Sequence, residues 1–157
     1  MNIVLRKSTQ EDWSIIQKLN LEVYLNSNQF DQYMNPDDPD SEESTKGFQD
    51  DVINPDKFCM IAEIDGNPIG YLVGFESNLS WRTNRRGEIN HMGVSPKYRS
   101  HGIGSMLVAE FKKWCLNRGL THVATTTYYD DAKARHFYEK QGMKPIDVTL
   151  EGSIENL

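Results

Sequence analysis

The chain has 157 residues, of which 38% are hydrophobic and 25% are charged, and this balance excludes a disordered or fibrous protein. Its formal net charge of -6 argues against a protein that binds nucleic acid or an anionic membrane with its whole surface. No segment approaches the roughly 20 apolar residues of a membrane span, so no membrane partner is expected.

In chain order, hydrophobic periodicity predicts a strand, two helices, three strands, a helix, a strand, a helix and a final strand. These elements cover residues 2–7, 9–26, 41–53, 58–64, 69–75, 88–94, 102–118, 122–127, 130–141 and 144–150. Thr9, with Asp12 three positions later, is placed to cap the first helix, and Asp65-Gly66 is typical of a hairpin turn. The order predicts an α/β (α+β) fold, in which helices flank a mixed, mostly antiparallel, twisted sheet.

The most informative segment is residues 94–107, where a strand ends, a tight loop follows, and Gly102 and Gly104 open a long amphipathic helix. The first N–H groups of a helix are unpaired and attract anions, and glycine lets a bulky anion approach the backbone closely. Arg99 adds positive charge to this loop. The pattern predicts a pyrophosphate site, although a glycine pair alone could serve only to pack the helix on the sheet.

Two other phosphate loops do not fit this segment. A Walker A loop needs Gly-Lys-Ser/Thr, whereas Gly104 is followed by Ser105 and Met106. A dinucleotide fingerprint needs a third glycine and an acidic residue after the next strand, and residues 122–127 contain no acid.

The pattern Arg99-x-x-Gly102-x-Gly104 after a Val-x-Pro strand end resembles the acetyl-CoA signature of the GNAT superfamily of N-acyltransferases. Residues 131–143 resemble the later motif of that family, with Ala, Phe-Tyr and Gly at its spacings. The resemblance covers about residues 58–143 of a single domain that spans residues 1–157. It implies a GNAT-like acyl-CoA acyltransferase fold with acetyl-CoA (coenzyme A) as cosubstrate. Asp131 departs from the Asn that is usual in the family, which puts its contact with the cofactor arm in doubt.

The resemblance also implies which residues bind acetyl-CoA. Backbone amides of one segment hold the pyrophosphate, and a strand end pairs with the pantetheine arm. The residues carried over are Met92, Gly93, Val94, Arg99, Ser100, His101, Gly102, Ile103, Gly104, Ser105, Asp131, Ala134 and Tyr138.

Two catalytic residues are expected. Tyr138 matches the tyrosine of the family that protonates the leaving thiolate, although it could be only a core residue. Glu88 is the best candidate for the base that deprotonates the amine, and strand alternation would place it on one face with Asn90 and Met92. An ion pair with Arg85 or Arg86 is an equally good interpretation of Glu88. His91 would face the other way and is a weaker candidate. The carbonyl oxygen is expected to lie at the backbone N–H near Val94.

The expected function is an N-acetyltransferase that acts on a primary amine by direct transfer in a ternary complex. A catalytically silent acyl-CoA sensor, and an acyltransferase with another donor or a hydroxyl acceptor, are the alternatives. Six acids and no base in residues 31–43 favour a cationic acceptor, unless this segment is only a solvated loop. Dimers are common in the family, so a homodimer is possible.

The remaining expectations concern metals, partners and location. The four histidines show no metal-ligand spacing, so we expect no metal, and the acceptor is expected to be a small molecule or peptide rather than a nucleic acid. Cys59 and Cys115 lie far apart in apolar segments and are expected to be buried free thiols. Such thiols are typical of a reducing compartment, so a cytoplasmic location is expected.

Overall fold

The structure is a computed structural model that describes residues 2–156. The chain forms two compact units, Met1–Thr126 and Thr127–Leu157. The first unit contains five strands and three α-helices, which follow the predicted order. They are β1 (Ile3–Lys7), α1 (Trp13–Ser27), α2 (Glu42–Ile53), β2 (Lys57–Ile64), β3 (Asn67–Ser77), β4 (Arg86–Val94), α3 (Ile103–Asn117) and β5 (His122–Thr125). Short 3-10 turns precede α1, α2 and α3, at Gln10–Asp12 (η1), Asp38–Asp40 (η2) and Pro96–Tyr98 (η3).

The five strands form one sheet in the order β1-β2-β3-β4-β5. The first four are antiparallel neighbours, and β4 pairs with β5 in parallel. The predicted mixed, mostly antiparallel sheet is therefore confirmed. Asp65 and Gly66 both adopt positive φ at the β2–β3 turn, which is the backbone geometry that the Asp-Gly pair predicts for a hairpin.

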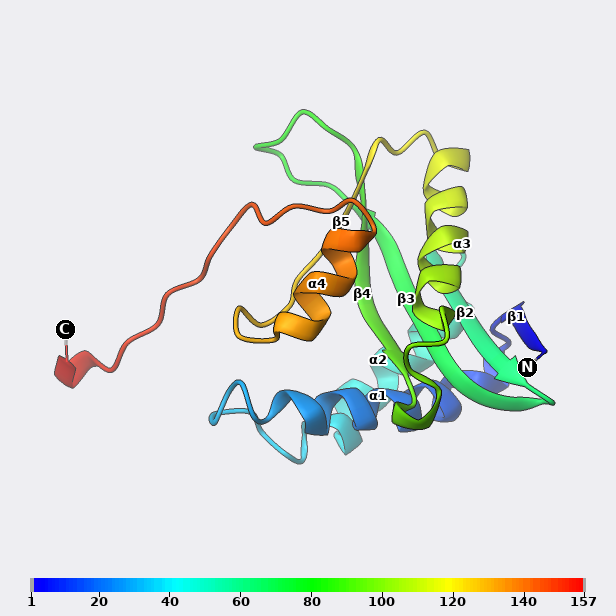
Figure 1. The fold of residues 1–157 in the computed structure, drawn as a ribbon, viewed down its shortest axis with the longest axis horizontal. Coiled ribbons are helices and arrows are strands. Elements are labelled where there is room, and N and C mark those ends of the chain that lie inside the picture. The colour runs from blue at the N-terminus through cyan, green and yellow to red at the C-terminus, as the bar shows by residue number, and fades with distance from the viewer. Residues whose placement is uncertain (1, 157) are drawn as a thin grey trace. The chain divides into compact units, whose positions relative to one another are not determined.

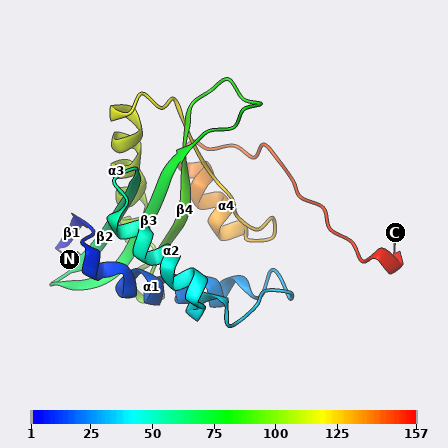
Figure 2. The same cartoon turned by 180° about the vertical axis from the view of Figure 1, so that it is seen from behind.

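Helices cover both faces of this sheet (Figure 1). One face packs against α1 and α2, which Figure 2 shows next to each other, and its core contains Ile16, Leu19, Phe48, Ile61 and Tyr71. The opposite face packs against α3, where Phe58 contacts the rings of Phe111 and Trp114. Cys59 and Cys115 are buried and free, as expected, and burial raises the pKa of each thiol to about 11.

A β-bulge in β4 reverses which side chains face which layer. Val73 pairs with His91 and the adjacent Gly74 pairs with Ile89, so Asn90 is the extra residue. A Cβ on Gly87 would meet Cys115 and Phe111 on the α3 side.

A Cβ on Gly93 would instead meet Val23 on the α1 side. Before the bulge Glu88 therefore faces α1 and α2, and after it His91 does so, while Met92 faces α3. The predictions that Met92 shares a face with Glu88 and that His91 faces the other way are wrong, because a bulge shifts the two-residue period by one.

The first two α-helices begin where local hydrogen bonds predict. The backbone N and Oγ1 of Thr9 both donate to Asp12 Oδ2, at 2.7 and 2.9 Å, ahead of α1. Asp12 also accepts from Arg6 of β1 at 2.7 and 2.8 Å, so this carboxylate ties the helix start to the sheet. Ser41 caps α2 by accepting from Ser44 N at 3.1 Å.

The second unit contains α4 (Ala132–Lys140) and a 3-10 turn, η4 (Ile154–Asn156). The predicted final strand over residues 144–150 is wrong, because none of the described strands pairs with this segment. Its alternating side chains Ile146, Val148 and Leu150 are 61%, 62% and 90% exposed. Alternation alone does not make a strand, since a strand also needs a neighbour to complete its hydrogen-bond ladder. Among residues 2–156 no helix is long and apolar enough to cross a membrane.

Candidate active site

The loop between β4 and α3 presents backbone amides in an anion-binding arrangement. Ser100 and Gly102 both adopt the left-handed backbone conformation, with φ of 64° and 80°. The first intrahelical bond of α3 runs from Met106 N to Gly102 O, so the amides of Ile103 and Gly104 have no acceptor within the helix. A Cβ placed on Gly102 would meet nothing within 4 Å, so the backbone there is open to a ligand. This geometry suits a phosphate or pyrophosphate group.

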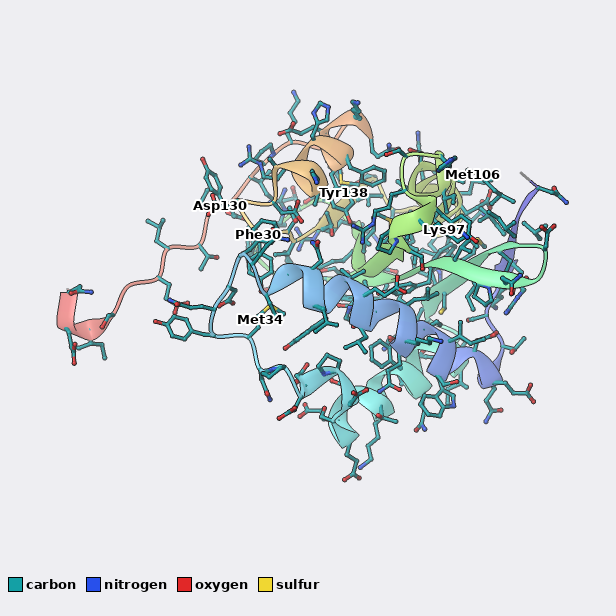
Figure 3. The ribbon with its side chains drawn as sticks, turned by 60° about the horizontal axis from the view of Figure 1, so that its bottom comes forward. Phe30, Met34, Lys97, Met106, Asp130 and Tyr138 are labelled. Carbon is teal, nitrogen blue, oxygen red and sulfur yellow. The ribbon has the colours of Figure 1, made fainter. Side chains whose placement is uncertain are left out.

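The charges of this loop favour an anion as well. Residues 95–109 include Lys97 and Arg99 and contain no acidic side chain. Figure 3 shows Lys97 ahead of α3 and Met106 within the early part of that helix. Arg99 Nε donates to Val94 O at 2.9 Å, so this guanidinium ties the loop to the end of β4. The expected pyrophosphate segment, Arg99 to Ser105, is thus held directly beside the strand end at Met92 to Val94.

A pocket of about 280 Å³ lies on the sheet face that packs against α1 and α2. Two helices, the η2 turn and strands β2 and β4 contribute to its wall. The lining residues are Asn20, Tyr24, Asp38, Pro39, Ser44, Gly47, Phe48, Asp51, Lys57, Asn90 and His91. Sequence reasoning missed most of this pocket, because its residues come from five separate elements that no single motif connects.

Hydrogen bonds from α1 hold the acidic segment at the edge of this pocket. Tyr24 Oη donates to Asn35 O at 2.6 Å, and Gln17 Nε2 donates to Pro39 O at 2.8 Å. The labelled side chains Phe30 and Met34 lie on the same connecting segment in Figure 3. Burial, followed by the carboxylates of Asp38 and Asp31, raises the pKa of Tyr24.

An ion cluster between α2 and β2 contributes Asp51 and Lys57 to the pocket wall. Asp51 is only 4% exposed, and its carboxylate accepts from Lys57 Nζ at 2.8 Å. Lys57 also bridges to Asp50 at 2.7 Å. Burial by itself would lower the pKa of Lys57, but its hydrogen bonds to Asp50 and Asp51 outweigh that effect and raise it. Lys57 is therefore a fixed cation, and its hydrogen bond to Asp50 lowers the pKa of that carboxyl.

His91 lies beside this cluster on β4. Its ring centroid is 5.8 Å from that of Phe48. Burial lowers the pKa of His91, the carboxylate of Asp51 opposes this effect, and the cation of Lys57 adds to it. The imidazole is therefore neutral at pH 7. Within the described residues no hydrogen bond to its ring is found.

Glu88, the expected base, is engaged in an ion pair. Arg86 Nη2 lies 3.1 Å from Glu88 Oε2, and the two side chains are 14% and 27% exposed. The Nε of Arg86 is buried without a hydrogen-bond partner in the described part of the chain. Of the two interpretations of Glu88, the ion pair is the arrangement that is present.

The remaining expected site residues belong to the second unit. Asp131 Oδ1 accepts from Ala134 N at 2.9 Å, so this acid caps α4. Tyr138 follows on α4, where its ring is in edge contact with that of Phe137, with centroids 5.1 Å apart. Among residues 2–156 no group of three or more His, Cys, Asp or Glu side chains is placed to hold a metal ion.

Comparison with known sequences identifies the same family that the two sequence motifs resemble. The model of the Acetyltransferase (GNAT) family matches residues 21–143. The chain is 29% identical over 95 residues to an uncharacterized N-acetyltransferase of Archaeoglobus fulgidus, a match that covers 60% of this chain and 65% of the relative. It is 28% identical over 98 residues to an acetyltransferase of Pectobacterium atrosepticum, covering 62% and 64%. The matched region thus spans less than two thirds of the length of either relative.

Solved structures share the fold at low sequence identity. A mutant of the BH1408 protein from Bacillus halodurans has a TM-score of 0.84 at 17% identity and covers 96% of this chain and 99% of its own. AAC(6')-Iy, bound to the bisubstrate analogue CoA-S-monomethyl-acetylneamine, has a TM-score of 0.74 at 13% identity and covers 98% of both chains. An aminoglycoside acetyltransferase from an uncultured soil metagenomic sample has a TM-score of 0.73 at 15% identity, covering 98% and 99%.

The five-stranded mixed sheet with flanking helices matches the acyl-CoA acyltransferase fold of these solved structures. The family match spans more than half of the chain, so this chain belongs to the GNAT family of acetyltransferases, a family that uses acetyl-CoA.

Proposed function

We propose that the protein transfers an acetyl group from acetyl-CoA to a primary amine, directly and within a ternary complex. The observation that carries the proposal is the course of β4. Asn90 and His91 of this strand line the pocket, and Val94, three residues after His91, leads into the anion-binding loop. A donor held at the loop and an acceptor held in the pocket would meet along one strand.

In this proposal acetyl-CoA lies with its pyrophosphate on the amides from Arg99 to Ser105. Its pantetheine arm follows the strand end at Met92 to Val94. The positive loop and the open backbone at Gly102 support this placement. The thioester carbonyl is held by the backbone N–H near Val94, which stabilises the oxyanion as the amine attacks.

The reaction moves three protons. The ammonium group loses one proton before its nitrogen attacks the carbonyl carbon. After the C–N bond forms, the nitrogen loses a second proton, and as the C–S bond breaks the thiolate gains one. Tyr138 is proposed as the acid that protonates the leaving thiolate, since a phenol has a pKa suited to that transfer. Glu88, proposed as the base, faces the pocket side of the sheet, where its Oε2 is paired with Arg86.

We propose further that the acceptor is a small cationic amine. Asp38 and Asp51 line the pocket, and the acidic segment borders it. The fold neighbours include an aminoglycoside acetyltransferase and a protein bound to a CoA–neamine analogue, which supports an acceptor with several amino groups. The buried free thiols support a cytoplasmic location.

A thiol-release assay with an acceptor panel tests the proposal. The panel contains neamine, spermidine, a lysine-containing peptide and, as a hydroxyl-only acceptor, glycerol, each with acetyl-CoA or succinyl-CoA. We expect rapid thiol release from acetyl-CoA with at least one amine and none with glycerol. Acetyl-CoA that binds tightly but releases no thiol with any amine would instead identify a silent acyl-CoA-binding domain.

A further inference from the structure

We propose that His91, rather than Glu88, takes the proton from the acceptor amine. This inference rests on the proposed function and assigns one further catalytic residue to it. Its starting point is the β-bulge at Asn90, which turns the His91 side chain from the α3 side of the sheet to the pocket side. A regular strand with the same sequence would point His91 at α3.

The surroundings of His91 suit a base. It lines the pocket next to Phe48, so one side of the ring is in an apolar environment. The charged and titratable groups around it are Asp51 of α2, Lys57 of β2, Asp38 of η2 and Tyr24 of α1. Burial is the largest of the effects on its pKa and lowers it, so the imidazole is neutral and can accept a proton at physiological pH.

The other candidate bases are already occupied. Glu88 is held by Arg86 at 3.1 Å, and Asp51 is held by Lys57 at 2.8 Å. Protonation of either carboxylate would weaken the ion pair that it forms with its cation. His91 has no such bond to break, because no hydrogen bond to its ring is found within the described residues.

The step balances without any further reagent. An ammonium group enters the pocket, and one ring nitrogen of His91 accepts a proton from it, which leaves a neutral amine and an imidazolium. The amine then attacks the thioester near Val94, the C–S bond breaks, and Tyr138 protonates the thiolate and regains a proton from the attacking nitrogen. A strand rises about 3.3 Å per residue, so the backbone of His91 lies about 10 Å from that of Val94 along β4. After the amide forms, the imidazolium returns its proton to solvent through the pocket.

Rate profiles against pH test this assignment. The probe is neamine, or the panel amine with the highest turnover. For the wild type we expect kcat/KM to rise to a plateau with an apparent pKa below the usual histidine value of about 6.5. For His91→Gln we expect kcat to fall by about 10²- to 10⁴-fold and the rise to move up to the pKa of the amine itself. The Kd for acetyl-CoA should stay unchanged.

Two variants serve as comparisons. His122→Gln, at an exposed position of β5, should retain both the rate and the profile of the wild type. Glu88→Gln should retain the rise of kcat/KM at low pH that is expected for the wild type. If Glu88→Gln loses that rise while His91→Gln keeps it, the base is Glu88 and the inference is wrong.

A second readout covers the case in which the glutamine variant folds poorly. His91→Ala removes the ring, and added imidazole should restore part of the lost kcat if a proton acceptor is what the pocket lacks. A properly folded alanine variant that retains wild-type kcat and pH profile would overturn the inference. Failure of wild-type protein to release thiol with any amine would refute the proposed function itself, which is a different result from failure of the variants to lose activity.

Discussion

Gly104 stands in the first turn of α3, where the proposed pyrophosphate meets backbone amides. A β-branched side chain there would intrude where the phosphate must approach. We expect Gly104→Val to weaken acetyl-CoA binding by at least tenfold, measured as Kd by calorimetry. Lys112→Val introduces the same β-branched side chain at an exposed position later in the same helix and should leave the Kd unchanged. Equal affinity in the two variants would show that the pyrophosphate lies elsewhere.

Tyr138 tests the acid role through its hydroxyl alone. Tyr138→Phe keeps the ring that contacts Phe137 and removes the hydroxyl group that would supply the proton. We expect kcat to fall by about 10²- to 10⁴-fold with no change in the Kd for acetyl-CoA. Tyr129→Phe makes the same chemical change on the exposed tyrosine that stacks with Arg135, and should be silent. A kcat within a few-fold of wild type for Tyr138→Phe would leave this tyrosine only an orienting role.

At the scale of elements, Asp12 joins the start of α1 to β1. The hydrogen bonds from Arg6 outweigh the effect of burial and hold the pKa of this carboxyl well below its usual range. A depressed pKa stabilises the fold above the pKa of the unfolded chain, about 3.9, and this contribution is lost as pH falls below it. We expect Asp12→Asn to lower the free energy of unfolding by about 1–3 kcal/mol at pH 7.

The difference in free energy of unfolding between wild type and Asp12→Asn should shrink steadily below about pH 5, because protonation of Asp12 removes its ion pair with Arg6. Urea unfolding of both proteins between pH 3 and pH 8 measures it. Asp65→Asn, at the exposed hairpin turn, is the matched control and should show no such pH dependence. A constant gap between wild type and Asp12→Asn at every pH would contradict the ion-pair explanation.

Local signals were enough to predict most elements of the first unit. Thr9 with Asp12 and the Asp65-Gly66 turn act within a few residues, so the sequence alone carries them. The bulge at Asn90 does not show in the sequence, because it arises from the register between β3 and β4. Residues 144–150 have the alternation of a strand at Ile146, Val148 and Leu150, yet strand formation depends on a partner that local alternation does not supply.

The same distinction holds for the site at the scale of the whole molecule. The anion-binding loop is one continuous segment, and its glycines predict it directly. The pocket is built from side chains of five elements, and Asp51 and Lys57 meet only after α2 has packed on the sheet. His91 enters it only because of the bulge. Sequence patterns therefore located the donor side of the proposed reaction, while the acceptor side depended on long-range packing.

The distribution of charge over the molecule gives a final prediction about the acceptor. Six acids lie within residues 31–43, and hydrogen bonds from Tyr24 and Gln17 hold this segment at the pocket. A cationic amine would be concentrated there by an attraction that salt screens over a Debye length of about 10 Å at 0.1 M. The triple change Asp37→Asn, Asp38→Asn and Asp40→Asn should raise KM for the amine and flatten its dependence on salt. KM for acetyl-CoA should not change.

A matched variant separates a local effect from a change in net charge. Glu11→Gln, Asp56→Asn and Asp65→Asn also remove three exposed acids, but none of these residues lines the pocket. Steady-state kinetics at 25 and 250 mM salt should distinguish the two triple variants, because only charges within about a Debye length of the bound amine retain their effect as salt rises. If both variants alter KM for the amine equally, overall charge attracts the acceptor. If neither does, the acidic segment is a solvated loop without contact to the substrate.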